Sequence, residues 1–190
     1  MQHQRQDLIG GRYGLLAIDH DDEALGHSST LHIQPDFWVN FLWKRIVGPI
    51  VLNLTATNTM GRTVRSYAFC GRPPSPHAAL GASSDATMSL VLINLNDHTA
   101  GTGPVLVALA GAAAYTTWTM TPGAGGPFGS DTLLNGKQLP TAIRDGVSIH
   151  KIPVAGIFHV SGATPVELPP ISVTFVLAEL DDPGLACIAR

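Results

Sequence analysis

The chain has 190 residues and a formal net charge of −3; 45% of its residues are hydrophobic and only 13% are charged. With a mean hydropathy of +0.20, this composition excludes a disordered chain and predicts one medium domain, or one domain with part of another. The small negative charge gives no basic field for nucleic acid, and no apolar run reaches the ~20 residues of a bilayer span, so neither a nucleic-acid partner nor a transmembrane segment is expected.

The first part of the chain predicts a strand followed by a long loop. Residues 7–17 form a short apolar stretch interrupted by glycines, and residues 18–34 are polar. The opening residues lack the apolar core of a signal peptide, so no secretion signal is expected in this chain. Three histidines lie in the polar loop without a paired spacing or an acidic third ligand, so no metal site and no cofactor are expected.

One helix is predicted from Pro35 to Gly48. Pro35 suits the first helical turn, where its missing N–H costs nothing. Asp36 complements the positive end of the helix, and the basic pair near the other end complements the negative end. Gly48 is expected to cap the helix, and Pro49 prevents its continuation. Apolar residues cover most of the helical surface, which predicts burial on more than one face.

After Pro49 the sequence changes to short β-type runs separated by Gly, Pro and Asn, a pattern typical of a β-sandwich. Residues 72–85, rich in Pro and small residues, predict a surface loop. The run at 108–114 suits a helix by composition, but its β-branched neighbours favour a strand. The expected fold is therefore mainly β, with these strands: 50–57, 64–70, 89–96, 105–114, 115–121, 131–134, 147–152, 154–161 and 172–180.

The two cysteines are too few for a disulfide scaffold or a zinc site. Cys70 ends a strand-like run, and Cys187 lies beyond the last predicted strand. The spacing fits either two buried thiols or a bridge, which would close a long loop worth up to ~4.7 kcal/mol in the chain-entropy model. Asn53, Leu54 and Thr55 form an N-glycosylation sequon, so Asn53 is a candidate modification site.

Several blocks, taken in order, resemble the C-terminal third of glycoside hydrolase family 79, the group of heparanase and the plant heparanase-like proteins. Residues 5–16, which contain Gly-Gly-Arg-Tyr-Gly, resemble its eighth barrel strand and the adjoining loop, and residues 35–38 with 42–48 resemble its last barrel helix. The later blocks, which include Leu-Pro-Pro-Ile-Ser-Val, are 65–70, 92–95, 119–122, 133–136, 168–176 and 186–187.

The resemblance implies that residues 1–48 are the remnant of a catalytic barrel (its last strand, loop and helix) and residues 49–190 a β-sandwich domain. It implies a retaining β-glucuronidase that hydrolyses O-glycosyl bonds in glucuronic-acid-containing glycans, in an extracellular, cell-wall, lysosomal or vacuolar compartment. It places Gly11 and Tyr13 at the substrate and favours a Cys70–Cys187 disulfide. Two departures are that Arg12 replaces the usual Asn and that residues 17–34 are longer than the usual link.

A retaining glycosidase needs two carboxylates about 5–5.5 Å apart, one as the acid and one as the nucleophile. The chain's glutamates are Glu23, Glu167 and Glu179, and none follows an Asn or lies in a Gly-Glu turn. Each has the setting of a solvated surface group. We therefore expect no catalytic residue in this chain, whose chemistry would be encoded upstream of Met1, and no activity from the chain by itself.

Two other hypotheses fit the same residues. The chain is a non-catalytic β-sandwich module that binds carbohydrate or protein, or it is a subunit that completes a split barrel by association through the exposed barrel remnant. An apolar helix exposed in a free-standing sandwich predicts association or aggregation. Trp38 and Trp43 are expected to pack that helix against a barrel, and Trp118 lies in a strand of alternating character.

Overall fold

The computed structural model describes residues 15–18, 31–55, 63–71, 87–97, 103–143, 154–160 and 164–181. The helices in these ranges are α1 (Pro35–Ile46) and the short 3-10 helix η5 (Gly126–Phe128). The strands are β1 (Leu16–Ile18), β2 (Leu31–Ile33), β3 (Val47–Leu52), β4 (Val64–Gly71), β5 (Thr87–Asn94), β6 (Val105–Val107), β7 (Ala112–Pro122), β8 (Thr132–Leu134), β9 (Lys137–Gln138), β10 (Ala142–Ile143), β11 (Ile157–Val160), β12 (Val166–Leu168) and β13 (Ser172–Leu180). The predicted mainly β fold is confirmed.

A large antiparallel sheet forms the centre of the molecule, with the strand order β3-β4-β5-β13-β7-β8-β9 and β11 also paired with β7. The central strand β13 is an almost continuous run of β-branched and apolar residues, and it is buried along most of its length. In its register Phe175 lies opposite Val91 on one side and Trp118 on the other. These pairs set the aromatic centre of one face.

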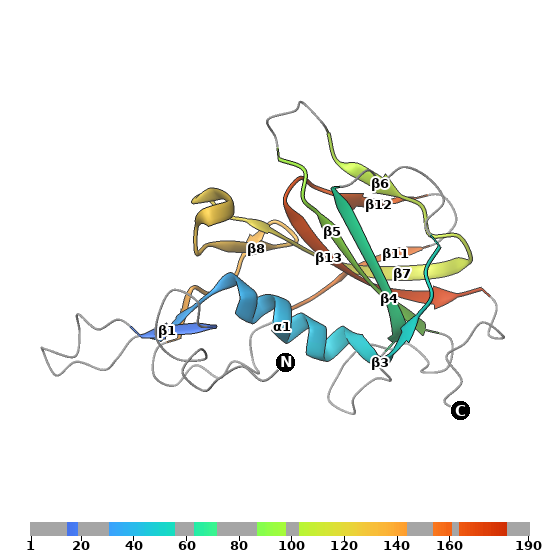
Figure 1. The fold of residues 1–190 in the computed structure, drawn as a ribbon, viewed down its shortest axis with the longest axis horizontal. Helices are drawn as coiled ribbons and strands as arrows, with labels where there is room; N and C mark the ends of the chain where they lie inside the picture. Colours follow the sequence, from blue (N-terminus) through green and yellow to red (C-terminus); the bar gives the residue numbers. More distant parts are fainter. Residues whose placement is uncertain are drawn as a thin grey trace, which may run out of the picture.

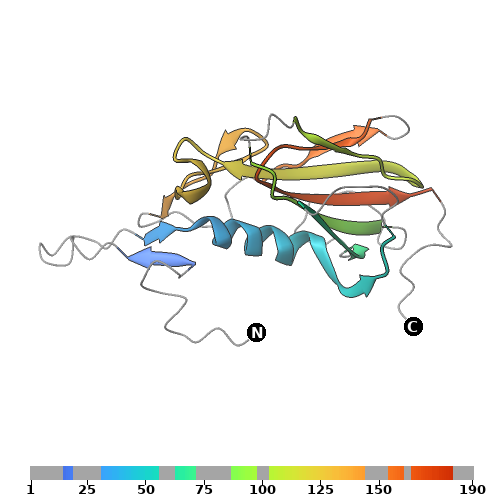
Figure 2. The ribbon, with the colours of Figure 1, turned by 45° about the horizontal axis from the view of Figure 1, so that its top comes forward.

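Helix α1 covers that face of the large sheet (Figures 1 and 2). Trp38, Leu42 and Ile46 succeed one another at intervals of four residues and therefore share one side of the helix. All three are almost fully buried and belong to one hydrophobic cluster with Phe69 and Phe175 of the sheet. The helix is thus part of the same core as the sheet.

The outward side of α1 is polar, which differs from the prediction of an almost entirely apolar surface. Asp36, Asn40 and Lys44 are exposed. Phe37 and Phe41 lie on one flank, partly buried against the core cluster. Most of the apolar side chains of α1 therefore lie on the part of its surface that packs against the core cluster.

The predicted glycine cap of α1 is wrong. The helix ends at Ile46, and the cap residue Val47 has an extended backbone that begins β3 and an N–H that donates to the carbonyl of Trp43. Gly48 lies within β3, where a Cβ atom would collide with the carbonyl oxygen of Cys70. A close approach of two backbones therefore requires the glycine there, and no left-handed cap is involved.

The other face of the large sheet is covered by a small antiparallel sheet of β6 and β12. Val166 and Leu168 of β12 are buried in a second cluster with side chains of β4, β5, β7 and β13. In the part of the chain that the structure describes, the sandwich therefore has one large layer and one layer of two strands. Strand β12 is too short to stand out in the sequence.

A third sheet, of order β1-β2-β10, ties the N-terminal segment to a later one. Its strands are extended by hydrogen bonds from the Ile33 N–H to the Thr141 carbonyl, at 2.8 Å, and from the Gln34 N–H to the Leu15 carbonyl, at 3.0 Å. Together with α1, this pairing joins residues before position 48 to residues after it. The predicted division at residue 48 stays a prediction.

The strand boundaries differ from the prediction mainly between β6 and β7. The chain turns before β7 at Gly111, whose φ of 77° is left-handed, so β7 begins at Ala112 and continues without a break to Pro122. The alternative of a helix at 108–114 is excluded by this turn and strand. The predicted strand 147–152 and the predicted loop 72–85 lie outside the described residues.

Candidate functional site

A groove of about 200 Å³ lies where α1 begins, between the first helical turn and the end of the large sheet. Its apolar lining comes from the helix and from the strands β5, β7 and β13. The apolar side chains that border it include Val39, Ile93, Leu95, Met120, Ile171 and Val173, and the polar residues are Asp36, Asn94, Thr121, Asp131, Thr132 and Ser172.

Asp36 lies at the rim because the helix starts there. Gln34 has an extended backbone and Pro35 occupies the first turn, and no side chain caps the helix. The carboxylate of Asp36 complements the positive end of α1. The carbonyl of the same residue accepts a hydrogen bond of 2.8 Å from Nδ2 of Asn40, one turn further on.

Asp131 reaches the groove from the segment just before β8. Its carbonyl accepts a hydrogen bond of 2.8 Å from the Gly123 N–H. A Cβ atom at Gly123 would lie 2.5 Å from the Cβ of Asp131, so glycine permits the loop to fold this closely. The loop then turns through Gly126, whose φ is 67°, before it reaches Asp131.

The third wall is a strained turn before β13. Ile171 has a φ of 47°, in the left-handed region that β-branched residues avoid, at a cost of about 1–3 kcal/mol. Three hydrogen bonds hold the turn: Ser172 Oγ to the Pro169 carbonyl at 2.6 Å, the Ile171 N–H to the Asn96 carbonyl at 3.0 Å, and Asn94 Nδ2 to the Pro169 carbonyl at 3.0 Å. These hydrogen bonds hold the wall in its strained conformation.

The groove offers carboxylates, hydroxyls and apolar groups. Its described lining contains no His, Lys, Arg or Cys. The Ser172 hydroxyl donates a hydrogen bond to the Pro169 carbonyl, and Asn94 Nδ2 donates to the same carbonyl. What the groove can do is accommodate an apolar group beside an acidic rim formed by Asp36 and Asp131.

Four of the residues discussed in the sequence analysis lie outside the ranges that the structure describes: Gly11, Tyr13, Glu23 and Cys187. Cys70 is buried in β4, with 5% of its surface exposed. The Cys70–Cys187 disulfide and the substrate contacts of Gly11 and Tyr13 stay predictions.

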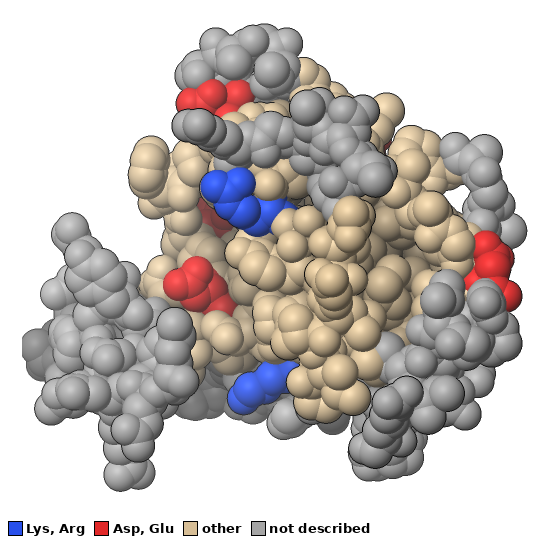
Figure 3. Space-filling view, turned by 45° about the vertical axis from the view of Figure 1, so that its right-hand side comes forward, with Lys and Arg blue, Asp and Glu red and all other residues tan. Residues whose placement is uncertain are grey.

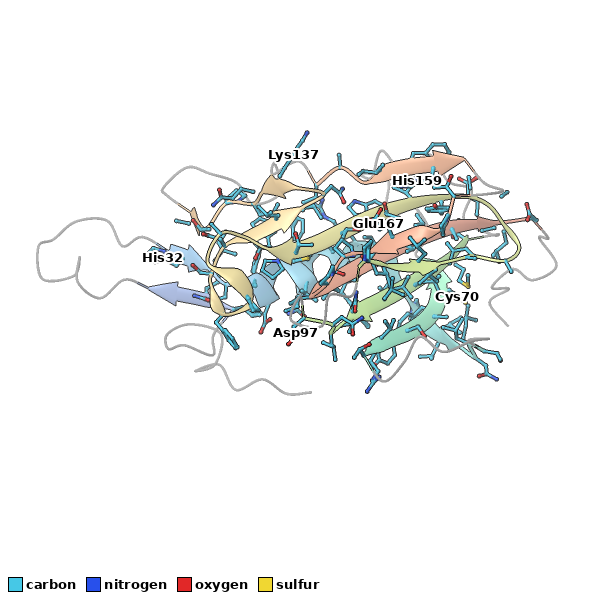
Figure 4. The ribbon with its side chains drawn as sticks, turned by 90° about the horizontal axis from the view of Figure 1, so that it is seen from above. His32, Cys70, Asp97, Lys137, His159 and Glu167 are labelled. Atoms are coloured by element: carbon cyan, nitrogen blue, oxygen red, sulfur yellow. The ribbon has the colours of Figure 1, made fainter. Side chains whose placement is uncertain are left out.

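The two described glutamates lie on different strands. Glu167 is exposed on β12, paired with Leu106, and Glu179 lies at the end of β13, opposite Thr87. Neither borders the groove. Figure 4 shows Glu167 apart from Asp97, the other carboxylate that it labels, and on the face drawn in Figure 3 the described charged side chains are few and the described surface is mostly uncharged.

The three tryptophans have different roles in the structure. Trp38 and Trp118 are core residues, with only 1% and 2% of their surfaces exposed. The Trp118 indole N–H donates to the Val154 carbonyl at 3.1 Å. Trp43 is 39% exposed and meets the buried Phe69 edge-on. Trp38 thus packs against this chain's own sheet, and of the three tryptophans only Trp43 is substantially exposed.

A polar cluster on β7 and β11 was not predicted from the sequence. Tyr115 stacks on His159 with ring centroids 4.7 Å apart, and its hydroxyl donates to the Thr164 carbonyl at 2.6 Å. Burial raises the pKa of Tyr115 above its ordinary value. Thr117 Oγ1 lies 3.2 Å from Nε2 of His159. The cluster fastens β11 to β7, and only the pairing of β11 with β7 brings these residues together.

The described residues contain no group of three or more His, Cys, Asp or Glu side chains that could hold a metal ion. Within the same ranges, no helix has both the length and the apolar character needed to cross a bilayer.

No protein-family model matches the chain. Among curated proteins, the chain is similar to Heparanase-like protein 3 of Arabidopsis thaliana, with 25% identity over 185 residues, which cover 90% of this chain and 31% of the relative. It is also similar to Heparanase-like protein 2 of the same plant, with 30% identity over 95 residues, covering 50% of this chain and 13% of the relative. The chain therefore spans less than a third of the length of either relative. At this low identity, the similarities support a family-level relationship with the heparanase-like proteins.

Proposed function

We propose that the chain is the C-terminal region of a heparanase-like retaining β-glucuronidase, which hydrolyses O-glycosyl bonds in glucuronic-acid-containing glycans. The observation that carries the proposal is the similarity across 90% of the chain to 31% of Heparanase-like protein 3. The chain's part in the reaction would be to support the catalytic barrel and to contribute substrate contacts from its N-terminal segment.

Two of the blocks that resemble the family form tight turns in this structure. Asn135 and Gly136 both have positive φ, as a two-residue hairpin turn between β8 and β9 requires. Asn135 also accepts from the Thr119 N–H at 2.9 Å and donates to the Ala155 carbonyl at 3.0 Å. The second is the strained turn before β13. These blocks therefore have a structural role in the fold. Their presence in the same order as in the family is evidence for a shared architecture.

Under this proposal the acid and the nucleophile belong to the part of the enzyme that the chain does not cover. Gly11 allows the backbone to approach the sugar closely, and the Tyr13 hydroxyl contacts the reacting sugar. The Cys70–Cys187 disulfide closes the sandwich, and the protein is extracellular or in the cell wall, lysosome or vacuole. Under this proposal the isolated chain, which has the substrate contacts but not the acid and the nucleophile, binds a glucuronic-acid-containing glycan weakly or not at all. It does not turn over a glucuronide.

The test is a chimera in which this chain replaces the corresponding region of Heparanase-like protein 3. We expect a folded chimera to hydrolyse an aryl β-glucuronide, and the isolated chain to show no turnover. Tyr13→Phe in the chimera should lower kcat/KM, while Tyr67→Phe, a change of the same type on β4, should not. A chimera that melts cooperatively but has no activity would contradict the proposal, as would turnover by the isolated chain that depends on Glu167 or Glu179.

The alternative is a non-catalytic β-sandwich that binds carbohydrate or protein. One observation favours it: α1 buries Trp38, Leu42 and Ile46 against this chain's own sheet, so the helix does not need a separate barrel to cover its main apolar face. The hypothesis of a split-barrel subunit instead requires that the chain associate with another chain through its N-terminal segment. Saturable binding of a glucuronic-acid-containing glycan by the monomeric isolated chain, without turnover, would support the binding module.

A further inference from the structure

Three apolar side chains are exposed around the buried Phe69 of β4. Trp43 meets Phe69 with ring centroids 5.2 Å apart, and Val51 of β3 is paired with Phe69. Tyr67 lies two residues before Phe69 on the same strand, so it points to the same side of the sheet. Trp43, Val51 and Tyr67 are 39%, 73% and 47% exposed. We call these three residues the Phe69 patch.

The candidate glycosylation site lies at the margin of this patch. Asn53, Leu54 and Thr55 come directly after β3 and are all exposed. The register of β3 and β4 pairs Val51 with Phe69 and Leu52 with Ala68. Continued by one residue, the same register sets Asn53 opposite Tyr67, on the side of the sheet that carries Val51. An acceptor amide and an apolar surface therefore adjoin.

We propose that Asn53 carries an N-linked glycan and that its first sugars lie over the Phe69 patch. In the transfer, Asn53 Nδ2 bonds to the anomeric carbon of an oligosaccharide carried on a lipid pyrophosphate. The bond from that carbon to the phosphate oxygen breaks, the lipid pyrophosphate leaves with the electron pair, and the transferase removes one amide proton. The C–H faces of the sugar rings pack on the exposed Trp43 and Tyr67 rings, and the sugar hydroxyls face water.

The position of β3 explains why a cover is needed there. It is the terminal strand of the large sheet in the described part of the chain, and Ile50 and Val51 are exposed on it. An exposed apolar edge strand is a template for pairing with a second chain. A bulky polar group at Asn53 would block such pairing while leaving the groove at the other end of α1 open.

The experiment is to secrete the full chain, with an added signal sequence, from eukaryotic cells. Thr55→Ser keeps the sequon and is the matched control, whereas Thr55→Ala and Asn53→Gln remove it. We expect a glycan mass on the wild type and on Thr55→Ser, lost in the other two variants. Enzymatic removal of the glycan from the folded wild type gives an unglycosylated protein for comparison, so the result does not depend on whether the variants fold.

Trp43 also supplies a direct optical readout. Because Trp38 and Trp118 are buried, acrylamide quenching of tryptophan fluorescence reports mainly on Trp43. We expect quenching to increase after removal of the glycan, and the protein to shift from monomer toward dimer in light scattering. The substitutions Val51→Ser and Tyr67→Ser together should keep the deglycosylated protein monomeric.

Three results would overturn the inference. One is a folded, secreted chain whose Asn53 carries no glycan. Another is a glycan whose removal changes neither quenching nor oligomeric state. The third is a glycosylated chain that dimerises through the Phe69 patch, because the patch would then be covered by a second copy instead of sugar.

Discussion

Replacing Trp38 by alanine tests whether α1 belongs to the core of this chain or only docks on it. Trp38 is 1% exposed, and its ring makes edge-on contacts with Phe37 and Phe41 at centroid distances of 5.3 and 5.7 Å. If α1 is part of the core, loss of this side chain should destabilise the sheet as well as the helix. If α1 is a loosely attached remnant of another domain, the sheet should hardly respond.

The burial of Trp38 sets the expected loss of unfolding free energy. Truncation of a fully buried tryptophan costs about 3–5 kcal/mol in transfer and cavity terms, against a total stability of about 5–15 kcal/mol for a domain. For a chain of this size that corresponds to a fall in Tm of roughly 6–20 °C. Trp43→Ala on the same helix removes a side chain that is 39% exposed, so it should cost only about 1–2 kcal/mol.

The measurement is urea unfolding monitored by circular dichroism, since fluorescence changes when a tryptophan is removed. We expect a single transition for the wild type and both variants, with the midpoint lowered most by Trp38→Ala. Lys44→Ala, on the exposed side of α1, should stay within about 0.5 kcal/mol of the wild type. A helix that unfolds before the sheet, or a Trp38→Ala variant no less stable than Trp43→Ala, would refute the reasoning.

Three further predictions concern Gly48, Tyr115 and the two cysteines. Gly48→Ala should lower the free energy of unfolding in urea by about 1–3 kcal/mol, because the added Cβ meets the Cys70 carbonyl. Gly48→Asn should be at least as destabilising, whereas a left-handed helix cap would tolerate Asn. Gly103→Ala, with open space around it, is the control. Burial raises the pKa of Tyr115, so its neutral form stabilises the fold below the unfolded pKa of about 10, and this stability is lost as the pH rises through the folded pKa. Tyr115→Phe should lower stability by about 1 kcal/mol at neutral pH through the lost bond to Thr164, and unfolding measured against pH should then show a smaller alkaline loss; an unchanged alkaline profile would count against this. Alkylation of the denatured, unreduced chain should find no free thiol if Cys70 and Cys187 are paired, and Cys187→Ser should lower stability by about 2–4 kcal/mol; two labelled thiols would rule the bridge out.

Local chemistry was enough to predict the elements whose signals lie within the elements themselves. Pro35 and Asp36 mark the start of α1, and the helix begins there. The β-branched and apolar run at 172–180 predicts β13 with the bounds that the structure has. In both cases the residues that decide the conformation are neighbours in the chain, so no distant contact is needed to predict it.

The candidate site was much less predictable. The groove combines the first turn of α1 with strands that lie about sixty to one hundred and forty positions further along the sequence. Nothing near Asp131 in the sequence indicates that it lies at the same recess as Asp36. The substrate contacts predicted at Gly11 and Tyr13 came from resemblance to a family, and both residues lie outside the described ranges.

The sequence by itself determined a mainly β chain with one short helix, because propensity, periodicity and helix-end signals act over a few residues. Only the tertiary structure decided which tryptophans are core, which side of α1 faces solvent, and why Gly48 must be small. Each of these depends on what lies across the interface from the residue: Trp38 and Trp43 are five positions apart on one helix, yet the sheet covers the first and leaves the second partly open.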